Sequence, residues 1–283
     1  MSGAADVTIR AASPGHDPRV KAPFGRRLCD VVANEAAGLY RLVEADDPTG
    51  PKPDAGQFYM LAAAEQWGSV DGGRPYLGRA FSVCRTHGSR LAFLVAAIGP
   101  GTERLASLER GEGLWIVGPL GAGFALPRPD LRPLLVGGGV GLAPLVILDD
   151  ALAEAGRPRS ALLGFRDAGH AGAARLLAGE SRLATDDGSV GYRGLVTDLL
   201  EAELERDRAA VVYACGPPAM LEAVRRICVE RSVPAQLALE EAMACGFGAC
   251  FGCVVPTTSG YRRICVDGPV VEAAELEPQW WGH

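Results

Sequence analysis

Short apolar runs separated by turn residues fill the first half of the chain. Their spacing is typical of short antiparallel strands that close into a barrel or pack as a sandwich. The runs are Cys29–Asn34, Leu39–Val43, Gln57–Ala62, Arg79–Cys84, Leu91–Ile98 and Leu114–Val117. The pattern predicts an antiparallel β domain over residues 26–129.

The pattern of apolar positions changes after Pro133. A buried-type run, Leu134–Val136, leads into a glycine-rich turn and then into a helical pattern over Pro144–Ala155. The next strand and helix candidates are Ala161–Phe165, Val211–Ala214 and Pro218–Glu230. Successive βα units of this kind predict a parallel sheet. We therefore expect a nucleotide-binding α/β domain over residues 130–236.

Regular elements become sparse at both ends of the chain. From about Leu237 a cysteine-rich loop is followed by one predicted hairpin, Cys253–Val255 with Tyr261–Val266, closed by Thr-Thr-Ser-Gly. This stretch predicts a small domain over residues 237–283. Residues 1–25 are rich in Ala, Gly and Pro without a period, which predicts a flexible leader.

Composition excludes several classes of function. The 283 residues are 48% hydrophobic and 22% charged, and the net charge of −6 with no basic stripe argues against nucleic acid binding. The longest apolar run, Leu134–Leu148, is too short and too interrupted by glycine to cross a bilayer. Residues 1–21 lack the apolar segment of a secretory signal. These features predict a cytoplasmic protein.

Four cysteines near the end of the chain have the spacing of iron–sulfur ligands. They are Cys245, Cys250, Cys253 and Cys265. Gaps of four and two residues let one loop supply three thiolates, and a fourth returns from a hairpin, as around a 2Fe–2S cluster. Glycines in the loop let backbone N–H groups approach the sulfides. The alternatives are a zinc site, a disulfide pair and buried cysteines that happen to cluster, but zinc ligands usually come as two separated pairs.

Two motifs in the first half could bind phosphate. Arg79 and Ser82 lie on a predicted strand, where a guanidinium can pair with a phosphate and a hydroxyl can meet a ring nitrogen. Gly99-Pro-Gly101-Thr102 precedes a helical segment, and backbone donors there could hold an anion such as the diphosphate of FAD. The alternatives are a solvated strand face and an ordinary turn in which Thr102 caps the helix.

Two motifs in the second half lie where a dinucleotide binds. Glycines between Val136 and Pro144 join a strand to a helix, although Pro144 replaces the third glycine of the usual fingerprint. Cys215 and Gly216 are expected at the carboxyl edge of the same sheet, and Cys215 lacks a neighbouring histidine that would make it a nucleophile. The histidines, which are His16, His87, His170 and His283, form no triad or metal spacing and are expected on the surface.

Taken in this order, the motifs resemble those of the ferredoxin–NADP reductase superfamily. Within it, Glu240–Val255 and Cys265–Pro269 resemble the electron-transfer subunits of class 1B dihydroorotate dehydrogenases. Thr185–Gly188 and Gly194–Asp198 fit the same family. The resemblance covers roughly residues 28–272 and leaves the leader unmatched.

The resemblance implies three cofactor domains: an antiparallel FAD-binding β-barrel, an NAD-binding α/β domain and a small C-terminal 2Fe–2S domain. It also implies an FMN-containing catalytic partner that oxidises dihydroorotate to orotate, in a heterotetramer of two chains of each kind. Electrons would pass from the partner's FMN to the cluster, then to FAD and finally to NAD+. The alternative keeps these cofactors but assigns another partner, of hydrogenase, sulfide dehydrogenase or transhydrogenase type.

The resemblance also assigns site residues. The FAD candidates are Arg79, Ala80, Phe81, Ser82, Leu94, Val95, Ala96, Gly101 and Thr102. The NAD candidates are Gly138, Gly139, Gly141, Phe165, Arg166, Asp187, Cys215, Gly216 and Pro217. Ser82, near the flavin N5, and Cys215 are the catalytic candidates, whereas Ala96 is smaller than the residue usual in the family. The lack of a basic cluster favours NAD over NADP, and Arg166 leaves that choice open.

Overall fold

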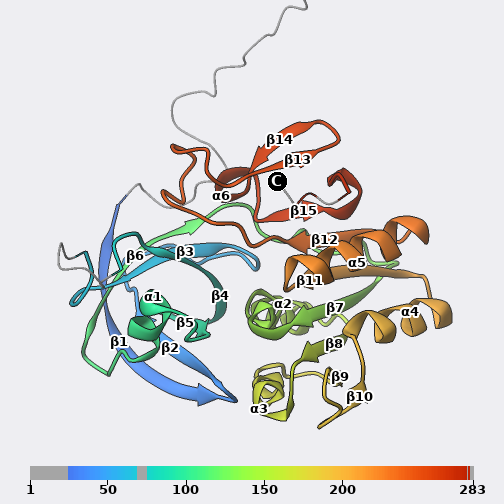
Figure 1. Cartoon of the computed structure of the whole chain (residues 1–283), viewed down its shortest axis with the longest axis horizontal. Coiled ribbons are helices and arrows are strands. Elements are labelled where there is room, and N and C mark those ends of the chain that lie inside the picture. The colour runs from blue at the N-terminus through green and yellow to red at the C-terminus, as the bar shows by residue number, and fades with distance from the viewer. Residues whose placement is uncertain (1–24, 69–74, 279, 281–283) are drawn as a thin grey trace, which may run out of the picture.

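The structure, a computed structural model, describes residues 25–68, 75–278 and 280. Figure 1 shows a barrel beside a layered α/β unit, with the C-terminal segment lying across the top of both. The predicted leader and the histidines at positions 16 and 283 lie outside the described residues. No helix within the described ranges is long and apolar enough to span a bilayer, and the cytoplasmic location stays a prediction.

The barrel confirms the antiparallel domain predicted from the alternating runs. Its closed strand order is β1-β2-β5-β4-β3-β6, and every neighbouring pair is antiparallel. The strands are β1 Arg27–Ala37, β2 Tyr40–Asp46, β3 Phe58–Ala63, β4 Arg79–His87, β5 Arg90–Val95 and β6 Gly113–Leu120. Helix α1, Pro100–Ala106, buries Leu105 against Tyr59 and Phe93 in the barrel core.

A seven-stranded sheet forms the second unit, in the order β10-β9-β8-β7-β11-β12-β15. All pairs are parallel except β12 with β15. The strands are β7 Arg132–Gly138, β8 Ser160–Phe165, β9 Ser181–Thr185, β10 Tyr192–Arg193, β11 Ala210–Cys215, β12 Ala235–Ala238 and β15 Val270–Glu272. The helices are α2 Ala143–Glu154, α3 Ala168–Ala171, α4 Val196–Arg206 and α5 Pro218–Glu230, with the 3₁₀ turns η1 Gly139–Leu142 and η2 Gly172–Leu176.

Side chains that alternate along the central strands build two cores, one on each face of the sheet. In β7, Leu134 and Val136 pack with α4 and α5, whereas Leu135 packs with α2 on the other face. A period of two is what a strand covered by helices on both faces requires. The predicted parallel α/β unit is therefore confirmed, and its carboxyl edge faces the barrel (Figure 1).

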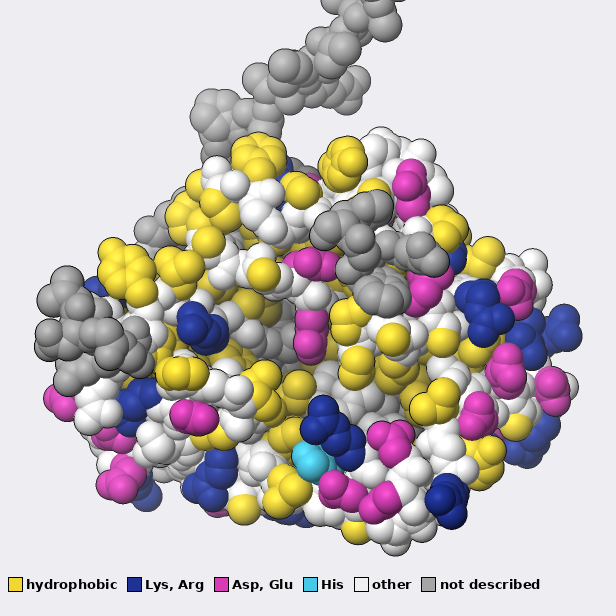
Figure 2. Space-filling model, viewed as in Figure 1, with side chains coloured by type: hydrophobic (Ala, Val, Ile, Leu, Met, Phe, Trp, Pro, Cys, Tyr) yellow, Lys and Arg dark blue, Asp and Glu magenta, His cyan; other side chains and the backbone are white. Residues whose placement is uncertain are grey.

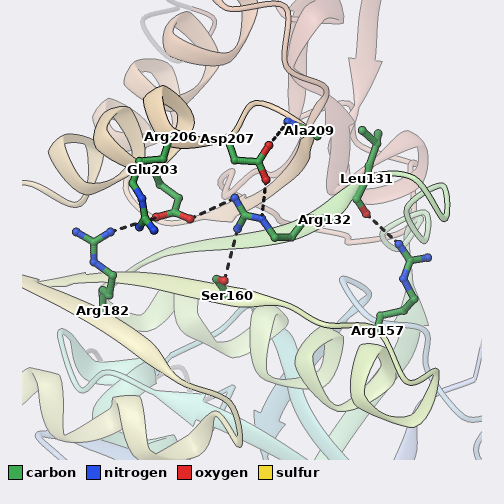
Figure 3. Close-up of polar contacts among 9 residues, drawn as sticks. All are labelled: Leu131, Arg132, Arg157, Ser160, Arg182, Glu203, Arg206, Asp207 and Ala209. Carbon is green, nitrogen blue, oxygen red and sulfur yellow. Dashed lines mark hydrogen bonds and ion pairs between the residues drawn. The ribbon is translucent and has the colours of Figure 1, made fainter.

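An ion-pair network fixes α4 at the opposite, amino-terminal edge of the sheet (Figure 3). Glu203 of α4 accepts from Arg132 of β7 at 3.2 Å, Arg182 of β9 at 3.3 Å and Arg206 at 3.3 Å. Arg132 also lies 3.5 Å from Asp207. One carboxylate thus links two strands and a helix, away from the edge where ligands bind.

The C-terminal segment leaves the sheet after β12 and returns to it as β15. Between them lie the hairpin β13, Val254–Thr257, with β14, Gly260–Arg263, and the turn α6, Ile264–Asp267. The expected second strand over residues 261–266 is too long, because Arg263 N donates to Asp267 Oδ2 at 3.1 Å and turns the chain into α6. The 3₁₀ turn η3, Ala273–Glu275, follows β15. The predicted domain boundary at residues 236/237 falls within β12.

Candidate redox sites

Three of the four motif cysteines lie on the loop between β12 and β13, and the fourth lies on α6. Cys253 and Cys265 are buried, whereas Cys250 is exposed. Cys265 N donates to Cys253 Sγ at 3.4 Å, and Gly252 N donates to Cys250 Sγ at 3.4 Å. These contacts bring the ligands from α6 and the loop together, as the spacing predicts.

The four thiols influence one another. Although burial opposes it, backbone N–H donors and the Cys250 side chain lower the pKa of Cys245 to about 6. Burial, Cys253 and the charge of Cys245 raise the pKa of Cys265 to about 12. Among the described residues no three His, Cys, Asp or Glu side chains converge on a single metal ion. Four cysteines are the ligand set of a 2Fe–2S cluster, in which each iron takes two of them.

Gly248 shapes the cysteine loop. Its φ of +89° lies in the left-handed region, and a Cβ there would lie 2.6 Å from Val266 Cγ2. The loop backbone can therefore approach α6 only without a side chain at this position. Met60 and Leu120 of the barrel share a core with Cys253 and Cys265, so the cluster loop is seated against the barrel.

A cavity between the barrel, α2 and the start of the cysteine loop gathers most of the predicted flavin residues. Its lining includes the FAD candidates Arg79, Ala80, Phe81, Ser82, Leu94, Ala96 and Thr102. The opposite wall is Val140, Ala143, Pro144 and residues 239–243. Val95 instead lies in the barrel core, 1% exposed. A polar strand face and apolar walls are suited to a flavin, whose ring is flat and whose tail is anionic.

Close packing holds the Arg79 guanidinium at this cavity. A Cβ at Gly101 would lie 2.9 Å from Arg79 Nε, so the absence of a side chain makes room for the guanidinium. Arg79 Nη1 donates to Leu77 O at 2.6 Å, which leaves other N–H groups for a phosphate. The Thr102 hydroxyl accepts from Ile98 N at 2.9 Å and Gly99 N at 3.1 Å, and so acts as a cap within its own turn.

A second cavity, of about 620 Å³, follows the carboxyl edge of the parallel sheet. Figure 2 shows this face hollowed at its centre, with acidic side chains on the upper rim and basic side chains and a histidine on the lower rim. The NAD candidates in its lining are Gly138, Gly139, Gly141, Phe165, Arg166, Gly216 and Pro217. Glycines at a strand–helix turn let a diphosphate approach the backbone, so the residues fit a dinucleotide.

Two NAD candidates lie outside the lining of this cavity. Cys215 is 1% exposed, and burial raises the pKa of its thiol well above 9, which keeps the thiol neutral. Asp187 lies in the turn after β9, where it accepts from Ser189 Oγ at 2.6 Å, and Asp186 lines the cavity beside it. The assignment of Cys215 and Asp187 to the site stays a prediction.

Sequence reasoning missed several cavity residues. Tyr40 comes from the barrel, and His170 follows β8; both line the nucleotide cavity. The His170 side chain is 24% exposed, so it lies at the surface of the protein and also in the wall of this cavity. Glu240 lines both cavities, and burial raises the pKa of its carboxyl group. Glu240 stands first in the cysteine-loop motif, and that position was the feature of the sequence that could have indicated its place in the cavities. Tyr40 had no local signal, because barrel and sheet meet only in the tertiary structure.

The flavin and nucleotide cavities are adjacent and share part of their walls. Ala96, Ile98, Val140 and Glu240 line both of them. A solved structure described as an NADH-dependent reduced ferredoxin-NADP oxidoreductase is similar over 91% of this chain and 92% of its own, with TM-score 0.75 and 26% identity. The ferredoxin reductase of carbazole 1,9a-dioxygenase shares the fold, with TM-score 0.62 and 23% identity over 74% and 66% of the two chains. Fold and cavities define a flavin- and iron–sulfur-dependent oxidoreductase of the ferredoxin reductase type, which uses FAD, a 2Fe–2S cluster and NAD.

Sequence relatives narrow the class. The family model for the iron–sulfur cluster binding domain of dihydroorotate dehydrogenase B matches residues 240–277. The dihydroorotate dehydrogenase B (NAD(+)) electron transfer subunit of Clostridium perfringens is 35% identical over 85% of this chain and 92% of its own. The same subunit of Geobacillus kaustophilus is 42% identical over 78% of this chain and 86% of its own. This chain belongs to the family of dihydroorotate dehydrogenase B electron transfer subunits.

Proposed function

We propose that this chain carries electrons from a catalytic partner, which oxidises dihydroorotate to orotate on its own FMN, through the 2Fe–2S cluster and FAD to NAD+. One observation carries the proposal: the cysteine loop begins in the wall of the flavin cavity, and the flavin and nucleotide cavities share four lining residues. Residues 239–243 line the flavin cavity, and Cys245 lies two residues further on. The three redox groups would therefore stand in series.

The chain's own residues bind and orient these groups. The four cysteines would hold the cluster, and Arg79 would pair with the FAD diphosphate. Ser82 would present its hydroxyl to the flavin N5 region from β4. When bound, FAD supplies the exchange between one-electron and two-electron chemistry. The glycine loop after β7 would hold the dinucleotide so that its nicotinamide reaches the flavin through the shared wall.

An apolar surface beside the cluster loop supports docking of a partner. Phe247 is 43% exposed, Phe251 61%, Val254 39% and Tyr261 78%. Figure 2 shows hydrophobic side chains gathered over the C-terminal segment. Aromatic residues at this density are typical of interface cores. We assign this surface to the FMN-bearing subunit, in a heterotetramer of two chains of each kind. The free thiols of the four cysteines outside the motif favour the cytoplasm as its compartment.

Reconstitution tests the function directly. The chain is loaded with FAD and cluster, mixed with the FMN-bearing catalytic chain encoded beside it, and supplied with dihydroorotate and NAD+. We expect NADH to form, and we expect no NADH when either chain is omitted. Absence of dihydroorotate-dependent NADH formation from two fully loaded chains would contradict the proposal.

The alternative partner is tested by the same material. A similar fold in a structure described as an NADH-dependent reduced ferredoxin-NADP oxidoreductase keeps another electron-donating partner as the alternative. If the chain instead copurifies with a hydrogenase, sulfide dehydrogenase or transhydrogenase component, and accepts its electrons, the family's cofactors remain and the donor assignment is wrong.

A further inference from the structure

The hairpin between β1 and β2 extends from the barrel to the sheet unit. Leu39 N donates to Gly169 O at 3.1 Å, and the Arg175 guanidinium donates to Ala36 O. Gly38 has a φ of +63°, and a Cβ there would lie 2.4 Å from Gly169 O. The hairpin is therefore fixed against the start of α3, at the rim of the nucleotide cavity.

Tyr40, the first residue of β2, places its side chain in the nucleotide cavity. It is 7% exposed, and its hydroxyl makes no hydrogen bond to any residue within the described ranges. A Cβ on Gly139 would lie 3.5 Å from the hydroxyl oxygen, so the hydroxyl faces the glycine loop. The hydroxyl oxygen itself is reached by solvent in the cavity, so a bound ligand can supply the hydrogen-bond partner that the protein does not. The hydroxyl points to the place where a diphosphate would approach the backbone.

Two further side chains complete this part of the cavity. Arg166, which follows β8, lines it and forms no ion pair or hydrogen bond through its side chain with the part of the chain that is described. It lines the same cavity as Tyr40, and its positive charge lowers the pKa of the Tyr40 hydroxyl, against the larger effect of burial. The His170 ring packs edge-on against Tyr40 with centroids 5.6 Å apart, and Asp167 Oδ1 lies 2.9 Å from His170 Nδ1. The Tyr40 ring is thus held in place from the sheet side.

Burial raises the pKa of Tyr40, so its hydroxyl stays protonated at neutral pH and can donate a hydrogen bond. A neutral donor beside an unpaired guanidinium suits an anion that brings several acceptor oxygens. A carboxylate ligand would use one or two of these donors, whereas a diphosphate spans the loop, the hydroxyl and the guanidinium together.

We propose that Tyr40 and Arg166 bind the phosphates of the dinucleotide, so that the flavin barrel supplies part of the nucleotide site. The inference rests on the proposed function, because it names how that nucleotide is held. Binding then depends on the contact between barrel and sheet. A nucleotide that pairs with both units stabilises their mutual position, and with it the alignment of flavin and nicotinamide.

Substitution of the hydroxyl alone tests the proposal. Tyr40→Phe is expected to weaken binding of NADH and of ADP-ribose about tenfold in titration calorimetry, since a hydrogen bond to a charged group is removed. Arg166→Gln is expected to weaken both by at least as much. FAD content, cluster absorption and melting temperature should stay at their wild-type values in both variants.

Matched controls come from the same chain. Tyr59→Phe removes another tyrosine hydroxyl without a hydrogen-bond partner, buried in the barrel core, and Arg182→Gln removes a guanidinium at the far edge of the sheet. Both should bind ADP-ribose like the wild type. Wild-type affinity of the Tyr40→Phe variant for ADP-ribose would overturn the role of Tyr40. Wild-type affinity of the Arg166→Gln variant would overturn the role of Arg166. Failure of the wild-type protein to bind either NADH or ADP-ribose would overturn the proposed function itself.

Discussion

At the scale of single residues, the cysteine loop carries chemistry that its neighbours make possible. The low pKa of Cys245 reflects backbone donors that stabilise a thiolate before any iron is bound. The cluster cysteines and the flavin cavity use different side chains, because none of the four cysteines lines the cavity. Cluster and flavin should therefore be separable by mutation.

Cys245→Ser is expected to abolish the 2Fe–2S absorption and its electron paramagnetic resonance signal, because one iron loses a thiolate ligand. FAD content should stay within about 20% of wild type, since no flavin contact is touched. NADH should still bleach the flavin. Cys228→Ser, at a buried cysteine on α5, is the control and should keep the cluster. Loss of FAD together with the cluster would contradict the separation of the two sites.

Glu240 shows how a residue in a site can cost stability. Its side chain is exposed to the cavities it lines, and desolvation by their walls raises its pKa from 4.5, so the charged form is less favourable in the folded chain than in the unfolded chain. The cost is present above the raised pKa and disappears below pH 4.5, where the carboxyl is protonated in both states. A neutral residue of the same shape avoids it.

Glu240→Gln is therefore expected to raise the melting temperature of the nucleotide-free protein at pH 7. The difference from wild type should shrink as the pH falls and vanish near pH 4. Differential scanning calorimetry across this range measures it, with Glu230→Gln, an exposed carboxyl on α5, as the control. A difference that grows toward acid pH would mean that Glu240 is stabilised as a carboxylate.

At the scale of elements, the sequence predicts the helices and strands whose ends and apolar pattern are set by residues close together in the chain. The predicted helix Pro218–Glu230 is α5 itself, because Pro217 and Pro218 set its start. Helix α4 was missed: it follows Leu195, which is no usual cap, and Asp198 Oδ2 instead accepts from Leu195 N at 3.0 Å. Strand β15 was missed as well, because its pairing with β12 joins residues far apart in the sequence.

The residues that line the cavities also divide into those with a local sequence motif and those placed only by the tertiary structure. Arg79 and the glycine loops sit in local motifs with a chemical reason for each residue type, so sequence reasoning found them. Tyr40 and His170 have their role only because a barrel hairpin meets α3. No periodicity or spacing carries that information.

The ion pairs of Glu203, which join α4 to two strands, can be tested by substitution. Glu203→Gln removes the charge that neutralises three guanidinium groups, while its own side chain is only 14% exposed. We expect a loss of about 1–2 kcal/mol in the free energy of unfolding, between the values for surface and buried pairs. Chemical denaturation in low and high salt measures it, and the loss should shrink in high salt. Glu205→Gln, whose carboxyl is 69% exposed and lies 3.9 Å from Arg231, should change little.

At the scale of the whole molecule, the three sites lie in a row from the C-terminal segment to the edge of the sheet. The cluster loop is seated on the barrel, its first residues line the flavin cavity, and the flavin and nucleotide cavities share part of their walls. A partner would reach the cluster at one end while the nucleotide enters at the other. The two exchanges need not compete for one surface.

Phe251→Asp is expected to weaken association with the catalytic chain at least tenfold, because a charge is placed in the apolar docking surface. Phe251 has a φ of +56°, a conformation that Asp tolerates, so the loop should keep its shape. Analytical ultracentrifugation measures the association, and cluster absorption verifies the fold. Val229→Asp, at an exposed apolar residue of α5, should assemble normally. Normal assembly of the Phe251 variant would place the partner elsewhere.

The pairing of β12 with β15 has a consequence for how such chains can change during evolution. Both ends of the cysteine segment are strands of the nucleotide sheet. The segment therefore cannot be exchanged between reductases as an independent module. A crossover within the loop after residue 239 would join a foreign β15 to a resident β12, whose register runs from Gln236 with Glu272 to Ala238 with Val270. Viable recombination joints should therefore fall before Ala235, and the cluster segment should be inherited together with the sheet edge to which it pairs.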